Sequence, residues 1–306
     1  MNDTGREILE KYQVRKTGPQ KTAFIAFMRE KYPTLRVEEG GFPRSRNLVV
    51  GDPDHAKAIF CAHYDTCAVM PFPNLITPQN ILFYLLYSVL VCIPFLALGG
   101  AASALLSLVT DSAALLYWTF LGVYFASFFG LLLFGRPNKH TVNDNTSGVI
   151  TLCELMDKLP ESVRAQVAFV FFDHEENGLI GSKYFHTKHK KSLANTPVIN
   201  FDCVSDGDQI LLVQSKPFMK RYGDALQDAF AEADGLVIHH AKSSSTIYPS
   251  DQGNFPCGVG VAALKRGWMG LYLDRIHTAR DTVMKEENIH YLVAAAARFL
   301  AACGIQ

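Results

Sequence analysis

The feature that most limits how this chain can fold is a pair of long apolar segments without charge. Residues 81–109 contain no Asp, Glu, Lys or Arg, and after Asp111 the same holds for residues 112–135. A helix needs about 20 apolar residues to cross a bilayer. Two such segments in tandem are difficult to bury inside one soluble domain or an oligomer interface, which is the alternative. We therefore predict a transmembrane hairpin with helices over roughly 80–99 and 113–134.

The charges beside these segments predict how the hairpin is oriented. Its connection contains no Lys or Arg, whereas Arg136 and Lys139 lie just after the second segment. Cations near the ends of transmembrane helices favour the cytoplasmic side of the membrane. The seven cysteines are scattered, and several lie in apolar runs, as is typical of reduced cytosolic thiols. We expect a membrane protein that crosses the lipid bilayer twice, with the rest of the chain facing the cytoplasm. Close helix contacts at glycines would also permit a homo-oligomer through Gly99, Gly100, Gly122 and Gly130.

Outside the hairpin, strand-length apolar segments alternate with amphipathic segments of helix length, which is typical of an α/β domain. The net charge is zero, so nothing indicates a nucleic-acid partner. The expected strands are 57–62, 167–172, 197–201, 210–213 and 259–264, with a strand pair over 36–50. The expected helices are 3–33 with a break at Gly18-Pro19, 150–159, 218–233 and 286–303.

Two adjacent carboxylates, Glu175 and Glu176, follow the apolar run of residues 167–172. Neighbouring side chains at the end of a strand point to different sides. One Glu can therefore bind a metal ion while the other remains free to transfer protons. By itself the pair is more simply explained as a solvated acidic turn, but four other segments carry metal-binding residue types in comparable positions.

Histidines and aspartates supply those four further positions. His63 follows the strand of residues 57–62, and the spacing to Asp65 suits an imidazole whose second nitrogen is held by a carboxylate. The others are Asp144, before a helix, Asp202, after a strand, and His277, in a polar turn. The carboxyl ends of strands in α/β sheets line the ligand crevice, so these side chains are expected to meet there.

The residue types in this set indicate a zinc site. Imidazoles with carboxylates suit Zn²⁺, with Co²⁺ or Mn²⁺ as substitutes. Five ligands exceed what one catalytic zinc needs, so we expect two ions that share a carboxylate. Glu175 would then take a proton from a water and pass it to a leaving amine.

Taken in order, these motifs resemble those of the di-zinc aminopeptidases of metallopeptidase family 28, over the chain outside the hairpin. The segments that carry the resemblance are His63-x-Asp65, Asn143-Asp144-Asn145-x-Ser147-Gly148, Glu175-Glu176, Asp202 and His277-x-x-x-Asp281. The resemblance implies the zinc exopeptidase fold, a three-layer α/β/α domain with a mixed, mostly parallel central sheet.

The resemblance also implies a role for each residue. One zinc would be held by His63, Asp144 and Asp202, and the other by Asp144, Glu176 and His277, with Asp144 bridging. Glu175 would be the general base, and Asp65 would hold His63. Ser250 and Asp251 are similar to a substrate-binding loop of the family, in which this chain has Gln252 where a His is common.

The hairpin is the main departure from the family pattern. His63 and Asp144 lie 81 positions apart, and 23 remain when residues 78–135 are left out. We therefore predict one peptidase domain, residues 1–77 and 136–306, interrupted by a hairpin of residues 78–135. The active site would lie near the membrane surface, where hydrophobic peptides are natural substrates.

Together these features predict a membrane-anchored di-zinc aminopeptidase that faces the cytoplasm. The alternatives are a dipeptidase or carboxypeptidase of the same fold, or a non-catalytic scaffold that has lost its metals. Glutaminyl cyclases resemble the fold but use one zinc, and the presence of both His63 and Asp144 favours two.

Overall fold

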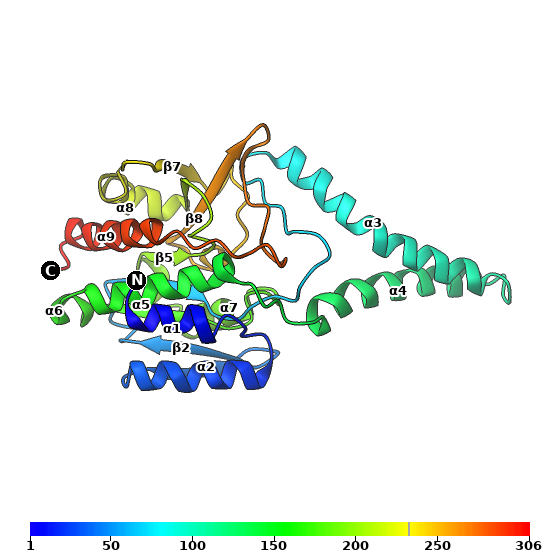
Figure 1. Cartoon of the computed structure of the whole chain (residues 1–306), viewed down its shortest axis with the longest axis horizontal. Helices are drawn as coiled ribbons and strands as arrows, with labels where there is room; N and C mark the ends of the chain where they lie inside the picture. Colours follow the sequence, from blue (N-terminus) through cyan, green and yellow to red (C-terminus); the bar gives the residue numbers. More distant parts are fainter. Residues whose placement is uncertain (232) are drawn as a thin grey trace.

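A sheet of eight strands crosses the larger part of the protein, and two long helices project from one end of it (Figure 1). The computed structural model describes residues 1–231 and 233–306. Across the sheet the strands are β1 (Arg36–Gly40), β2 (Ser45–Val50), β4 (Val167–Phe172), β3 (Ala58–His63), β5 (Val198–Phe201), β8 (Gly258–Gly267), β6 (Gln209–Gln214) and β7 (Val237–Lys242). A short β9 (Gly270–Tyr272) pairs with the end of β8.

The pairing of the strands brings several strand ends to one edge. Strands β4, β3, β5 and β8 are parallel neighbours, and β6 and β7 are also parallel. The antiparallel pairs are β1 with β2, β2 with β4, and β6 with β8. This confirms the predicted mixed, mostly parallel sheet. The carboxyl ends of the parallel strands therefore lie side by side, as a ligand crevice requires.

Helices cover both faces of the sheet and give the predicted three layers. On one face, Phe60 and Phe169 share a hydrophobic core with side chains of five helices. These are α1 (Asp3–Lys11), α2 (Gly18–Lys31), α5 (Gly148–Lys158), α8 (Lys216–Ala229) and α9 (Glu286–Ala302). On the opposite face, Cys61 and Val170 pack with Phe185 of α7 (Ile180–Lys188). A short α6 (Glu161–Arg164) precedes β4.

The helix ends follow local signals in the sequence. The side chain of Asn2 accepts a hydrogen bond from the backbone N–H of Gly5 and caps α1. Thr17 and Gln20 form a capping box at the start of α2, with Pro19 in its first turn. The predicted break at Gly18-Pro19 is thus the beginning of a second helix.

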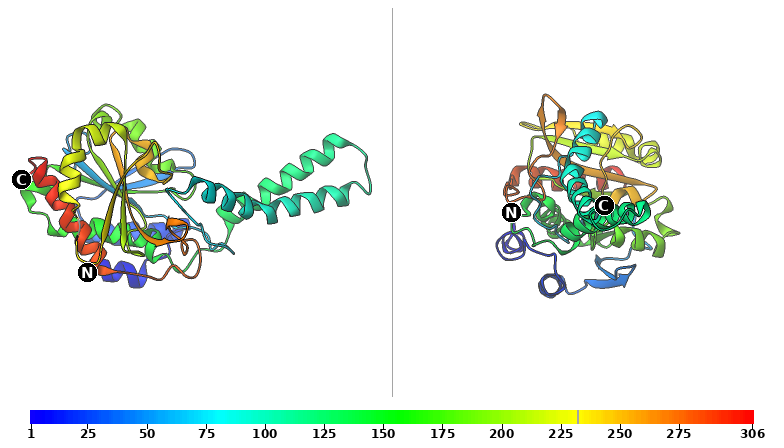
Figure 2. Two further views of the ribbon diagram at one scale, coloured as in Figure 1. Left: turned by 90° about the horizontal axis from the view of Figure 1, so that it is seen from above. Right: turned by 90° about the vertical axis from the view of Figure 1, so that its right-hand side faces the viewer.

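The projecting hairpin consists of α3 (Ile81–Leu106) and α4 (Ala113–Phe134), which pack against each other and extend away from the sheet (Figure 2). Both helices are long and apolar enough to cross a bilayer. The first helix was predicted to end near residue 99, but it continues to Leu106. The reason is that Gly99 is a contact point instead of a break: a Cβ there would lie 2.7 Å from the backbone oxygen of Phe120.

Two other elements differ from the sequence prediction. Strand β7 was not expected, because it lies at the edge of the sheet and includes the polar pair His239 and His240. The helix expected over 218–233 ends at Ala229, and residue 232 in that range lies outside the described residues.

Candidate metal centre

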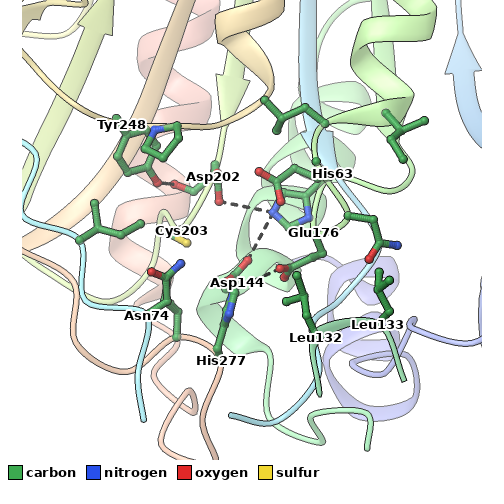
Figure 3. A pocket seen from close by; sticks show the side chains of 18 of the residues that line it. His63, Asn74, Leu132, Leu133, Asp144, Glu176, Asp202, Cys203, Tyr248 and His277 are labelled. Carbon is green, nitrogen blue, oxygen red and sulfur yellow. Dashed lines mark hydrogen bonds and ion pairs between the residues drawn. The ribbon is translucent and has the colours of Figure 1, made fainter. Parts of the chain in front are cut away.

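The five predicted ligands, which come from distant parts of the chain, meet in one pocket at the carboxyl edge of the sheet (Figure 3). His63 is the last residue of β3, and Asp202 follows β5. Glu176 lies in the turn after β4, and Asp144 lies just before α5. His277 comes from the loop between β9 and α9. The parallel strand pairing is therefore what brings three of the five side chains together.

Asp144 stands at the centre of this arrangement and faces both imidazoles. Its Oδ1 lies 3.3 Å from Nε2 of His63, and its Oδ2 lies 3.1 Å from Nε2 of His277. Asp202 Oδ1 is 3.5 Å from Nε2 of His63, and Glu176 Oε2 is 3.2 Å from Nε2 of His277. The ligands thus form two groups that share one carboxylate.

Burial and close opposite charges shift the protonation of these groups in opposite directions. Burial raises the pKa of Glu175 well above its usual range, against the effect of the nearby His63, and it also raises the pKa of Glu176. The pKa of Asp144 is lowered, because its contacts with the two imidazoles outweigh the effect of burial. The carboxylate-rich surroundings raise the pKa of His277 well above 6.5 despite its burial.

Glu175 occupies a different position from Glu176, as expected for neighbours in a turn. A carboxylate oxygen of Glu175 lies within 4.8 Å of ligand atoms of both His63 and Asp202. Glu176 instead faces His277. Glu175 also lines the open pocket, so it can reach a bound molecule.

Asp65 holds the turn that carries the two glutamates. Its carboxylate accepts hydrogen bonds from the backbone N–H groups of Glu175, at 2.9 Å, and Glu176, at 3.3 Å. Nδ1 of His63 lies 3.7 Å from the Asp65 carboxylate and 3.1 Å from its main-chain oxygen. The residue therefore fixes the glutamate turn as well as bordering the imidazole.

Two further buried groups position the site. The Asp281 carboxylate accepts hydrogen bonds from the backbone N–H groups of Asn143, at 2.7 Å, and Asp144, at 3.0 Å. Arg15 is fully buried and donates to the hydroxyl of Thr146 at 3.2 Å. Arg15 does not stand out in the sequence, because an arginine between two helices usually points to solvent.

The loop predicted to contact substrate is placed differently from the expectation. Ser250 and Asp251 are buried and do not line the pocket, whereas Tyr248 and Pro249 of the same loop do. The Ser250 hydroxyl accepts a hydrogen bond from the side chain of Asn200 at 2.9 Å. Which residues of this loop face the pocket depends on how its backbone is placed, and the sequence does not show that placement.

One wall of the pocket is formed by the hairpin. The sequence did not show which hairpin residues would lie at the site. Phe129, Leu132 and Leu133 of α4 line this pocket of about 610 Å³. Figure 3 shows Leu132 and Leu133 near the ligand cluster. Two thiols also border the ligands. Cys203 lies beside Asp144 and Asp202, and Cys67 lies beside Glu176 and His277.

The donor set suits zinc. Glu176 Oε1 is buried and has no hydrogen-bond partner among the described residues, and Asp202 Oδ1 is buried with only the 3.5 Å contact to His63. Buried carboxylate oxygens without a partner are costly unless a cation binds them. Two imidazoles with three carboxylates are ligands that zinc accepts, and the two halves of Asp144 face separate groups.

Comparisons with known proteins place the chain in a family and show which folds it resembles. A family model described as "Peptidase family M28" matches residues 132–301. None of the curated proteins matches the chain.

Solved structures show a similar fold. The LapA aminopeptidase of Legionella pneumophila is 12% identical with a TM-score of 0.57, over 99% of this chain and 68% of that chain. Glutaminyl cyclase of Porphyromonas gingivalis is 14% identical with a TM-score of 0.59, over 98% of this chain and 97% of that chain. Glutaminyl cyclase of Macrostomum lignano is 11% identical with a TM-score of 0.59, over 99% and 90%. At these identities the likeness shows the fold alone.

Proposed function

This chain belongs to peptidase family M28, and we propose that within the family it is a membrane-anchored di-zinc aminopeptidase. The observation that carries the proposal is the position of Asp144, whose two oxygens face His63 and His277 separately. One zinc would be held by His63, Asp144 and Asp202, and the other by Asp144, Glu176 and His277. Such a pair supplies Lewis-acid polarisation of a carbonyl and activation of water.

The protein's own residues supply the proton transfer. Glu175 lines the pocket beside His63 and Asp202, and its burial raises its pKa well above that of an exposed glutamate. A carboxylate in this position can take a proton from the attacking water and then give it to the departing amine. The Asp65 carboxylate holds the backbone of Glu175 in place for both transfers.

Cyclisation of amino-terminal glutamine is the second candidate activity, because glutaminyl cyclases share the fold at TM-scores of 0.59. Asp144, which is shared between two imidazoles, favours the hydrolase, because two metal sites are expected in the hydrolase and one in the cyclase. The reaction products distinguish the hydrolase from the cyclase. A hydrolase releases a free amino acid from a peptide, whereas a cyclase releases ammonia from a peptide that begins with glutamine.

The hairpin is proposed to anchor the domain in a bilayer. Exposed aromatic side chains surround its base: Phe42 is 95% exposed, Phe134 is 85% exposed and Trp268 is 84% exposed. Trp268 packs edge-on against Phe83 in the first turn of α3, with ring centroids 5.2 Å apart. Phe42 lies in the β1–β2 turn, which the antiparallel pairing of β2 and β4 places at the carboxyl edge of the sheet. Trp side chains are enriched at membrane interfaces, so the position of Trp268 at the base of the hairpin supports this placement.

The test uses purified, detergent-solubilised protein. Metal analysis should give two zinc ions per chain, and a panel of dipeptides should release free amino-terminal residues. One zinc per chain with release of ammonia would support the cyclase, and absence of metal would support a non-catalytic scaffold.

A further inference from the structure

A second cavity, of about 250 Å³, lies at the base of the hairpin beside the metal centre. Tyr84 and Val91 of α3 and Phe128 of α4 form its helical walls. The loop of residues 70–75, which leads into the hairpin, closes it on the side of the catalytic domain. The cavity therefore exists because the two inserted helices are present.

This cavity borders the pocket of the metal centre directly. Asn74, Leu132 and His277 line both spaces, so the two cavities are adjacent and share these side chains. Figure 3 shows Asn74 and Leu132 on either side of His277. A molecule bound at the metal-binding residues therefore lies beside the second cavity, at the side chains that the two spaces share.

Hydrogen bonds hold the cavity in shape. The backbone N–H of Met70 donates to the carbonyl of His277 at 2.7 Å. The hydroxyl of Tyr87 in α3 donates to the carbonyl of Pro73 at 2.7 Å. The loop is therefore fastened to a metal-ligand segment on one side and to the hairpin on the other. A preformed cavity binds a side chain at a lower entropic cost than one that must be ordered.

The lining selects for an apolar occupant. Among the described residues, the cavity has no Asp, Glu, Lys or Arg in its wall. The hydroxyl of Ser88 donates to the carbonyl of Tyr84 at 2.8 Å within the helix, so that donor is already used. Most of the wall is apolar, with Asn74, His277 and Tyr84 among its polar side chains, so a charged side chain would lose hydration over most of its surface. A large aliphatic or aromatic side chain would gain buried area.

We propose that this cavity is a substrate subsite that takes a bulky apolar side chain next to the scissile bond. The inference rests on the proposed peptidase function and specifies its substrate class as peptides with a large apolar residue at or beside the amino terminus. It also gives the hairpin a second role, because α3 and α4 then determine specificity as well as anchoring the domain.

The test compares two tryptophan substitutions on the same helix. Val91 lines the cavity, whereas Val89 is 63% exposed on the outer surface of the helix. kcat/KM is measured for peptide pairs that carry Phe or Ala at the first or the second position. Because one methylene in an apolar pocket changes kcat/KM by roughly 10- to 200-fold, the Phe-to-Ala ratio should fall at least ~10-fold in Val91→Trp. The ratio in Val89→Trp should stay as in the unmodified protein.

A second, smaller substitution at Val91 keeps the subsite testable if Val91→Trp does not fold. Val91→Ala enlarges the cavity and should raise the rate for Trp-containing peptides relative to Phe-containing ones. An unchanged preference in both Val91 variants, at both peptide positions, would overturn the subsite. The same result is expected if a lipid or detergent chain fills the cavity instead. If the unmodified protein hydrolyses no peptide at all, the proposed function fails and the subsite fails with it.

Discussion

At the scale of single residues, the site depends on the difference between two neighbouring glutamates. Glu176 faces His277, whereas Glu175 lies beside His63 and Asp202 and borders the open pocket. The turn that separates them is held by the Asp65 carboxylate through two backbone N–H groups. Substitutions at these positions should therefore have separable effects on metal content and on turnover.

Glu175→Gln should retain the fold and the metal but lose turnover. The amide cannot accept and return a proton, and general base catalysis contributes roughly 100- to 10,000-fold. We expect kcat to fall within that range while zinc content per chain stays unchanged. Glu161→Gln, on the surface of α6, is the matched control. Normal turnover in Glu175→Gln would remove this residue from the mechanism.

Asp144→Asn should weaken both metal sites together. Each carboxylate oxygen faces a different imidazole, so removal of the charge affects both groups. Metal titration should show both zinc affinities reduced, with Asp111→Asn in the hairpin connection as the control. If only one affinity changes, Asp144 does not bridge two ions.

A buried histidine outside the metal centre, His189, gives a pH dependence that can be separated from the metal site. His189 Nδ1 lies 2.9 Å from Asp54, and its Nε2 lies 3.1 Å from Glu38. Burial lowers the pKa of His189, but the two carboxylates outweigh it and raise the pKa above 6.5. Below pH 6.5, protonated His189 contributes its full stabilisation of the folded state through these two contacts. That contribution is lost as the pH rises through the pKa of His189 in the folded protein.

His189→Gln should therefore lower Tm most in mildly acidic buffer. The Tm difference from the unmodified protein should shrink as the pH rises from about 6 to about 8. His140→Gln, at an exposed position, is the control. A Tm difference that is constant over this range would show that protonated His189 does not contribute to stability.

At the scale of elements, the hairpin is a tightly packed unit with a defined contact point. A Cβ on Gly99 would lie 2.7 Å from the backbone oxygen of Phe120, whereas one on Gly100 would meet nothing within 4 Å. Nearby, the Ser103 hydroxyl donates to the carbonyl of Leu116 at 3.1 Å. Small residues permit such close approach of helices.

Gly99→Ala should separate α3 from α4 and destabilise the protein. Overpacking of a close contact typically costs about 1–3 kcal/mol. Thermal unfolding in detergent should show a lower Tm for Gly99→Ala, and Gly100→Ala should leave Tm unchanged or raise it slightly. Equal effects of the two substitutions would contradict the packing seen here.

At the scale of the whole molecule, the proposed topology places the hairpin connection and the catalytic domain on opposite sides of a bilayer. Leu108, in the connection, is 80% exposed. In intact cells, Leu108→Cys should react with a membrane-impermeant maleimide. Lys139→Cys, beside the domain, should react only after the membrane is permeabilised. The reverse pattern would invert the orientation, and reaction of both would exclude insertion.

Much of this arrangement could be predicted from the sequence, for identifiable physical reasons. His63 and Asp202 directly follow apolar strands, and parallel strands end at one edge. Burial of Arg15 and the inward direction of Asp251 could not be predicted, because both depend on contacts with segments far away in the sequence. The length of α3 was missed because Gly99 reads as a helix break until its partner helix is known.

The wall that α4 contributes to the pocket has a mechanical consequence. Leu132 lies in the last turn of α4 and borders both cavities beside His277. Helices in a bilayer tilt to match its thickness. A change of tilt would shift Leu132 against the ligand cluster, so turnover in reconstituted vesicles should vary with acyl-chain length.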